Sequence, residues 1–177
     1  MTGHVYGRYS REDALCQSNG YFSLNLRPAA VERIVELLQL RRGASVAWVG
    51  CGDGRELLSV ARRHPDAVFD AFEINGCALD VARRVARVEG VTNVTFHHED
   101  FLRAARRPLY THVYSTAVAG PQLYAQLAQA CSGRLCVLRE MWVGGTDATE
   151  LQTATVRLMG SGEQRQLVCG AVQTNAG

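Results

Sequence analysis

Three glycines at alternate positions are the sequence feature with the most direct chemical meaning. They follow an apolar run over residues 45–49, which is typical of a buried strand, and a helical pattern begins near Arg55. Glycines let the main chain turn sharply and let a ligand approach the backbone, while a helix start offers N–H groups to a carboxylate or phosphate. A tight turn without a ligand is the alternative. The predicted ligand-binding residues are Gly50, Cys51, Gly52, Asp53 and Gly54.

Acidic side chains stand at the ends of the next two predicted strands. Glu73 ends a strand over residues 68–73, where a carboxylate can accept hydrogen bonds from both ribose hydroxyls. Asp100 and Phe101 follow a strand over residues 94–97 and suit an adenine amine and the face of the base. The structural alternatives are a strand-end carboxylate for Glu73, a helix N-cap for Asp100 and core packing for Phe101. Together with the glycine turn, these residues predict a site for an adenosyl ligand with a carboxylate tail.

The elements that must position these residues alternate between strand and helix. Strand patterns continue over residues 110–115 and 135–138, and helical patterns run from Arg27 to a C-cap at Gly43 and over residues 55–64, 77–89 and 122–131. This alternation predicts a parallel sheet covered on both faces. Residues 153–159 and 166–172 are two strands with no helix between them. The expected fold class is therefore α/β, a Rossmann-like doubly wound sheet of seven strands with a C-terminal antiparallel hairpin.

The length of 177 residues fits one domain, which we expect to span residues 27–177 behind an N-terminal arm of residues 1–26. All 19 basic residues are arginine, so the lysine of a P-loop is excluded. The formal net charge of +2 is too small to indicate nucleic-acid binding. The sequence contains no membrane-length apolar run and no secretory signal. Its scattered cysteines resemble reduced thiols without metal-ligand spacing. We therefore expect an intracellular protein of cytoplasm or nucleus, with no metal site and an open oligomeric state.

The Gly-x-Gly-x-Gly spacing of residues 50–54 resembles that of the class I, seven-strand S-adenosylmethionine-dependent methyltransferases. A nicotinamide dinucleotide site would instead have Gly-x-Gly-x-x-Gly, and here Arg55 takes the last position. The closing hairpin is a further feature of the family, and the resemblance extends from residue 31 to about residue 172. It implies methyl transfer with S-adenosylmethionine as the cofactor. The acceptor would then lie roughly 3–3.5 Å from the methyl carbon.

Residues 100–102 and 113–121 resemble the non-SET histone lysine methyltransferases, the disruptor-of-telomeric-silencing family. This resemblance implies a protein lysine in a histone or nucleosome as acceptor, with Tyr21, Tyr114 and Ser115 lining the catalytic channel. Trp48 stands where the family has an acid for the methionine ammonium, and Ser115 stands at a family asparagine. Two alternatives stay open. One is an RNA or small-molecule methyltransferase of the same fold, and the other is a catalytically inactive binding or interaction module.

Overall fold

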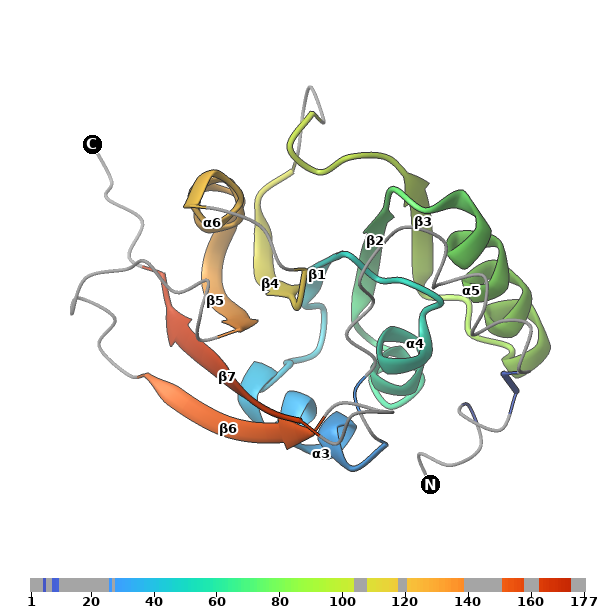
Figure 1. Cartoon of the computed structure of the whole chain (residues 1–177), viewed down its shortest axis with the longest axis horizontal. Helices are drawn as coiled ribbons and strands as arrows, with labels where there is room; N and C mark the ends of the chain where they lie inside the picture. The colour runs from blue at the N-terminus through green and yellow to red at the C-terminus, as the bar shows by residue number, and fades with distance from the viewer. Residues whose placement is uncertain are drawn as a thin grey trace.

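A single seven-stranded sheet organises the chain (Figure 1). The computed structural model describes residues 5, 8, 9, 26, 28–103, 108–117, 121–138, 151–157 and 163–172. The strand order is β3-β2-β1-β4-β5-β7-β6. In chain order the strands are β1 (Ser45–Val49), β2 (Val68–Glu73), β3 (Val94–His98), β4 (Tyr110–Ser115), β5 (Cys131–Leu138), β6 (Gln152–Arg157) and β7 (Gln164–Ala171). Strands β1 to β5 are parallel, and β7 is antiparallel to both β5 and β6.

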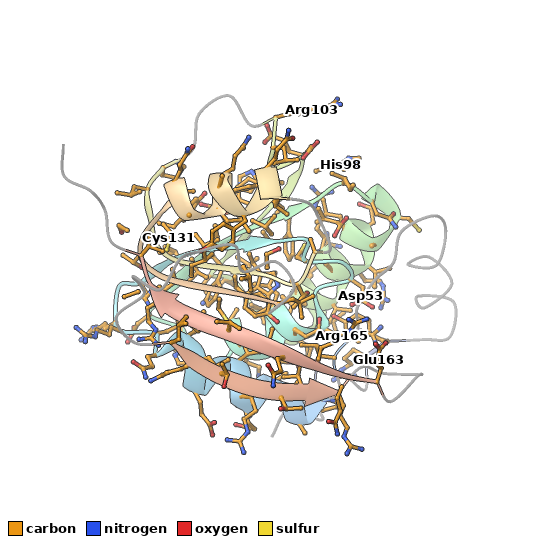
Figure 2. All side chains as sticks on the ribbon, turned by 60° about the vertical axis from the view of Figure 1, so that its left-hand side comes forward. Asp53, His98, Arg103, Cys131, Glu163 and Arg165 are labelled. Carbon is orange, nitrogen blue, oxygen red and sulfur yellow. The ribbon has the colours of Figure 1, made fainter. Side chains whose placement is uncertain are left out.

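Four helices are described: α3 (Pro28–Leu38), α4 (Arg55–Ala61), α5 (Gly76–Glu89) and α6 (Pro121–Gln129). Helix α4 contacts both α3 and α5, so these three form one layer against the sheet. Helix α6 contacts β5, and Figure 2 shows it on the side of the sheet opposite α3. Helices on both faces explain why the central strand β1 is an apolar run rather than an alternating one. The predicted α/β fold class, with seven strands and a closing antiparallel hairpin, is confirmed.

Local sequence explains the ends of α5, the helix that follows the predicted ribose-binding strand. The Asn75 side chain accepts a hydrogen bond from the backbone N–H of Ala78 at 3.3 Å, which is the N-cap arrangement. Gly90 ends the helix with φ of 65°, a left-handed conformation that favours glycine. Both ends of α5 are thus fixed by residues at its own termini, and the helix begins shortly after β2 ends.

Element boundaries differ from the sequence expectation, most clearly at α3 and β5. Helix α3 ends at Leu38 rather than at Gly43, and Gln39 is the residue beyond it with positive φ, at 49°. Strand β5 begins at Cys131, whereas the sequence predicts Cys131 as the end of the preceding helix. Within β5, a Cβ on Gly133 would lie 2.4 Å from the carbonyl of Thr111, so only glycine fits there.

The cysteines are partly as expected. Cys51, Cys131, Cys136 and Cys169 are free and buried. Cys77 is disulfide-bonded, with a partner outside the described residues. The prediction of reduced thiols is therefore wrong at this position. Within the described helices, none is long and apolar enough to cross a membrane.

Candidate functional site

The predicted ligand residues gather where the carboxyl ends of four neighbouring strands meet. Val49 and Ser115, the last residues of β1 and β4, are register partners, as are Glu73 and His98 at the ends of β2 and β3. The chain runs from β1 outward to β2 and β3 and then returns to β4 on the other side of β1. Ligands of open α/β sheets bind at such a reversal of strand order.

The glycine turn after β1 has a conformation that requires its glycines. Gly50, Gly52 and Gly54 have φ values of 75°, 55° and 79°. The backbone N–H groups of Gly50 and Cys51 both donate to the carbonyl of Phe72 on β2, at 2.8 and 3.1 Å. A Cβ on Gly50 would lie 2.9 Å from the Cβ of Ala117. The turn is thus tied to β2 and in close contact with the segment that follows β4.

Glu73 is the second link between β2 and the glycine turn. Its Oε2 accepts a hydrogen bond from the N–H of Gly52 at 2.7 Å. Its Oε1 accepts from the N–H groups of Ile74 and Asn75, both at 2.9 Å. Since each carboxylate oxygen can accept two hydrogen bonds, one further lone pair is left on Oε2 for a ligand hydroxyl. The side chain predicted for ribose therefore lies directly beside the turn.

Asp53 and Arg55 form a buried ion pair on the turn. The Asp53 side chain is 1% exposed and that of Arg55 is 7% exposed. The Arg55 Nε lies 3.0 Å from both carboxylate oxygens of Asp53, and Nη2 also donates to Oδ2. Hydrogen bonding and charge attraction from Asp53 raise the pKa of Arg55 against the effect of burial. The Asp53 charge is therefore already balanced within the protein.

Glu56 adds a second buried carboxyl group behind the turn. Its Oε1 accepts a hydrogen bond from the backbone N–H of Leu26 at 2.8 Å. Burial, and then repulsion from Asp53, raise the pKa of Glu56 to about 7. Burial also raises the pKa of the Cys51 thiol well above its usual range, with Glu73 and Asp53 adding to the effect. Cys51 is thus a neutral thiol at physiological pH and not a ready nucleophile.

Two of the three predicted catalytic residues lie in the core. Tyr114 is 1% exposed, and its ring centroid lies 4.0 Å from that of Trp48 on the neighbouring strand. The Ser115 hydroxyl is buried, donates to the carbonyl of Val49 at 3.0 Å and accepts from the N–H of Ala117 at 3.2 Å. The third, Tyr21, lies outside the described residues. Tyr114 and Ser115 therefore lie in the core below the strand ends, where they can influence the shape of the site without being exposed in it.

The predicted adenine residues stand beyond the end of β3, in the turn that leads to Arg103 (Figure 2). Asp100 is half-buried, and its Oδ1 accepts a hydrogen bond from the N–H of Leu102 at 2.9 Å. Phe101 is 3% exposed and packs edge-on against Phe72, with ring centroids 5.0 Å apart. Phe101 therefore supports the edge of the site as part of the core.

Sequence reasoning missed one exposed apolar residue at this edge. Ile74 directly follows Glu73, and 45% of its surface is exposed. Ile74 lies between the last residue of β2 and the N-cap Asn75 of α5, so it belongs to neither the strand nor the helix. An apolar residue at such a position is the sequence signal that could have identified it. Ile74 is available to cover an apolar ligand face next to Glu73.

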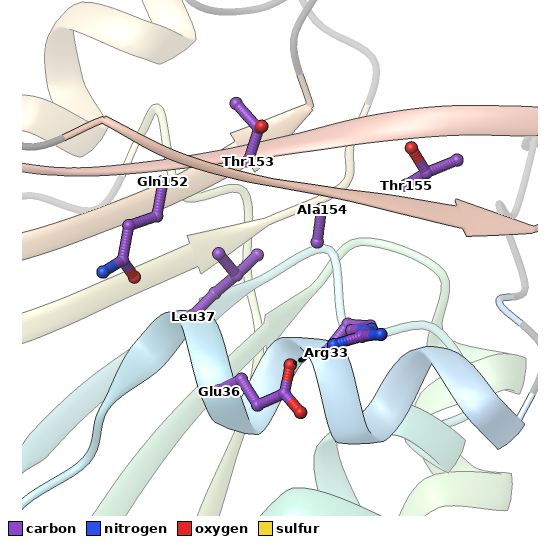
Figure 3. Close-up of a pocket in the computed structure, with 7 residues that line it drawn as sticks. All are labelled: Arg33, Glu36, Leu37, Gln152, Thr153, Ala154 and Thr155. Atoms are coloured by element: carbon purple, nitrogen blue, oxygen red, sulfur yellow. Dashed lines mark hydrogen bonds and ion pairs between the residues drawn. The ribbon is translucent and has the colours of Figure 1, made fainter.

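A separate groove of about 600 Å³ lies between α3 and β6 (Figure 3). Arg33 and Glu36, which line it, form an ion pair at 2.6 Å. Gln152, at the start of β6, accepts hydrogen bonds from both Gln39 and Arg134. None of the glycine-turn residues lines this groove. It is therefore distinct from the site at the strand ends.

Comparison with protein families agrees with the geometry of the strand ends. A family model for the methyltransferase small domain matches residues 12–116, more than half of the chain. The chain belongs to the methyltransferase small domain family. The matched segment includes the glycine turn, Glu73, Asp100 and the end of β4. The predicted identity as a class I methyltransferase is confirmed at the level of the family.

A curated relative of this methyltransferase small domain chain is "Methyltransferase ungE'" of Aspergillus campestris. The two are 34% identical over 70 residues, which are 39% of this chain and 20% of the relative. The chain thus matches about a fifth of the length of that relative.

Solved structures of methyltransferases share the fold of this family member. TrmN from Thermus thermophilus has a TM-score of 0.69 and 18% identity, with 93% of this chain and 53% of that chain covered. Magnesium protoporphyrin IX methyltransferase of Synechocystis PCC 6803, with bound S-adenosylmethionine, has a TM-score of 0.65 and 15% identity, with 82% and 79% covered. At these identities the likeness shows the fold.

Proposed function

We propose that this chain transfers a methyl group from S-adenosylmethionine to an acceptor held above the end of β4. The observation that carries the proposal is the contact of three strand ends. The glycine turn of β1 is bonded to Glu73 of β2 at 2.7 Å, and a Cβ on Gly50 would lie only 2.9 Å from the Cβ of Ala117 beyond β4. A cofactor on the turn would then lie between an acid for its ribose and the segment that faces an acceptor.

The residues present fit this cofactor. The glycine turn leaves room for a ligand close to the main chain, Glu73 keeps acceptor capacity for a hydroxyl, and Ile74 exposes apolar surface beside it. When bound, S-adenosylmethionine supplies an activated methyl group. We propose Gly50, Cys51, Gly52 and Gly54 as its main-chain cradle, with Glu73, Asp100 and Phe101 toward its nucleoside. Asp53 acts through Arg55 on the shape of the turn.

A small molecule is the acceptor class that we favour. Four described arginines that lie in arginine-rich stretches of the sequence are each paired with a carboxylate, which leaves less free positive charge for an RNA backbone. Arg62 bonds Glu89 at 2.7 Å and Arg63 bonds Glu32 at 2.5 Å. Arg83 bonds Asp80 at 3.2 Å and Arg103 lies 3.5 Å from Asp100. The name of magnesium protoporphyrin IX methyltransferase also indicates a small-molecule acceptor.

A histone lysine acceptor has weaker support. It rests on the sequence pattern of residues 100–102 and 113–121, while Tyr114 and Ser115, expected to line its channel, are buried. An apolar, water-excluding channel would be needed to deprotonate the lysine. Such a channel would have to be built by other residues. RNA remains an acceptor to be tested beside it.

A catalytically inactive binding module is the second candidate function. Two observations favour it: Trp48 is 2% exposed and packed on Tyr114, and the Asp53 carboxylate is paired with Arg55. Neither side chain offers a free charge to the ammonium of the cofactor. This candidate predicts weak cofactor binding and no turnover.

Calorimetric titration with S-adenosylhomocysteine, with NAD as the comparison ligand, tests the cofactor. Binding of the first and not of the second is expected, and the reverse result would overturn the proposal. Transfer of a labelled methyl group to small nucleophiles, RNA, free histones and nucleosomes then tests the acceptor. A signal confined to nucleosomes would favour the histone hypothesis. Binding without transfer to any acceptor would favour the inactive module.

A further inference from the structure

The N-terminal segment makes direct contact with the glycine turn through Tyr9. The Tyr9 hydroxyl donates a hydrogen bond to the carbonyl of Asp53 at 2.8 Å, across 44 positions of sequence. The Tyr9 ring also lies against the Arg55 guanidinium, with the guanidinium carbon 4.5 Å from the ring centroid. One side chain therefore contacts both members of the buried ion pair.

These contacts fix the residue in the middle of the turn. Asp53 lies between Gly52 and Gly54, both of which have positive φ and few conformational restraints of their own. Tyr9 holds its carbonyl oxygen, while Arg55 holds its carboxylate through Nε and Nη2. With its carbonyl and its carboxylate both bound, the peptide group between Asp53 and Gly54 cannot rotate without breaking the hydrogen bond from Tyr9.

The electrostatic surroundings make the contact with the ring favourable. The Arg55 guanidinium is 7% exposed and lies near two carboxyl groups, those of Asp53 and Glu56. A buried cation is stabilised by the negative face of an aromatic ring, most strongly where water is excluded. The Tyr9 ring therefore covers a side of the guanidinium that would otherwise meet apolar atoms or solvent.

Neighbouring residues anchor the same segment elsewhere. Val5 is 2% exposed and packs with Leu58 of α4 and Val81 of α5. Arg8 bonds Glu89, at the end of α5, at 2.6 Å. These two residues attach the segment to helices, whereas Tyr9 reaches the turn itself. A variant of Arg8 therefore tests whether attachment of the N-terminal segment to the helices matters, separately from the contact of Tyr9 with the turn.

We propose that Tyr9 is a positioning residue for cofactor binding, which holds Asp53 and thereby presets the glycine turn. The proposal rests on the proposed function, because the ligand of the turn is taken to be S-adenosylmethionine. It makes the N-terminal segment a part of the cofactor site. Affinity for the cofactor is then set partly by a residue that does not touch it.

Calorimetric titration of Tyr9→Phe and Tyr9→Leu with S-adenosylhomocysteine tests the proposal. Loss of the hydroxyl in Tyr9→Phe should weaken binding about fivefold, in keeping with one neutral hydrogen bond. Loss of the ring as well in Tyr9→Leu should weaken it about thirtyfold or more. In assays with an acceptor, KM for S-adenosylmethionine should rise while kcat at saturation stays near the wild-type value.

Arg8→Gln is the matched control, because it loosens the segment without touching the turn. Its affinity for S-adenosylhomocysteine should stay within about twofold of wild type. Wild-type affinity in both Tyr9 variants would overturn the proposal, and so would equal losses in Arg8→Gln and Tyr9→Leu. Hydrogen exchange of residues 50–54 without ligand gives a separate measurement. Faster exchange in Tyr9→Leu alone supports positioning even if no cofactor binds, in which case the proposed function is what fails.

Discussion

The carboxylate of Glu73 accepts a hydrogen bond from the backbone N–H of Gly52 at 2.7 Å. This bond joins the end of one strand to the turn that follows its neighbour. The same carboxylate also caps the N–H groups of Ile74 and Asn75. One side chain therefore shapes both the turn after β1 and the exit from β2.

Replacing Glu73 by glutamine should weaken S-adenosylhomocysteine binding by roughly 10- to 100-fold. The amide keeps the size of the side chain, but its NH2 group cannot accept a hydrogen bond, so a backbone donor or a ribose hydroxyl loses its partner. Calorimetry measures the loss. Glu99→Gln, an exposed acid at the same edge, is the control and should bind as wild type. Equal affinities for all three proteins would remove Glu73 from the cofactor site.

Gly50→Ala should be far more damaging than Gly43→Ala, although both glycines have φ of 75°. A Cβ at position 43 meets nothing within 4 Å, so only the left-handed conformation costs free energy, about 1 kcal/mol. A Cβ at position 50 also meets the Ala117 Cβ at 2.9 Å, which adds about 1–3 kcal/mol of overpacking. Denaturant unfolding compares the two variants, and Gly50→Ala/Ala117→Gly should recover most of the difference.

Similar unfolding free energies for Gly43→Ala and Gly50→Ala would show that the turn has space beside Ala117. In that case the segment after β4 would not be held against the glycine turn. The expected companion result is loss of S-adenosylhomocysteine binding in Gly50→Ala only.

Ser115→Ala should lower stability by about 1–2 kcal/mol, because the carbonyl of Val49 and the N–H of Ala117 each lose a hydrogen bond. Since Ala117 follows β4, kcat should fall while affinity for S-adenosylhomocysteine stays within about threefold. Ser132→Ala is the matched control, as that hydroxyl also donates to a carbonyl, of Tyr110, at 3.0 Å. Lost turnover at unchanged stability would instead indicate a direct catalytic part for Ser115.

Glu56 should make the folded protein less stable as pH rises. Its folded pKa of about 7 lies above the ordinary value of 4.5, so the folded state binds the proton more tightly than the unfolded state. The contribution is fully present below pH 4.5 and is lost as pH rises to about 7, a span of roughly 3 kcal/mol. Glu56→Gln should therefore have a higher Tm than wild type at pH 8.

The comparison of Glu56→Gln with wild type should change with pH. Near pH 4, where Glu56 is protonated in both the folded and the unfolded protein, the two Tm values should nearly coincide, because glutamine can still accept the hydrogen bond from Leu26. A difference in Tm that is constant from pH 4 to pH 8 would contradict the raised pKa. Thermal scans at several pH values measure it.

The local parts of the site follow from the sequence. A mostly apolar run of five residues, followed by glycines at alternate positions, identifies β1 and its turn without long-range information. Glu73 follows in a similar way, because the mostly apolar run of β2 ends on this acid. Parallel strands place their carboxyl ends at the same edge of the sheet. The proximity of these two strand ends therefore follows from topology and does not require knowledge of any specific contact.

The parts that sequence reasoning missed depend on register and distant contacts. The burial of Tyr114 depends on its register pairing with Trp48 in the neighbouring strand, and no periodicity in β4 alone indicates this. Tyr9 reaches Asp53 across 44 positions, so the contact behind its proposed positioning role is visible only once the chain is folded. The end of α3 was misplaced because an apolar residue, Leu40, and two arginines continue the helical pattern past Leu38.

The position of β7 between β5 and β6 has a consequence for the order of folding. Strand β6 is made before β7, yet among the described residues β7 is its only neighbour in the sheet. Newly synthesised β6 therefore cannot join the sheet until β7 has been made and has paired with β5. During this interval β5 and β6 both have open hydrogen-bonding edges, which is when a growing chain of this topology is most exposed to wrong pairing.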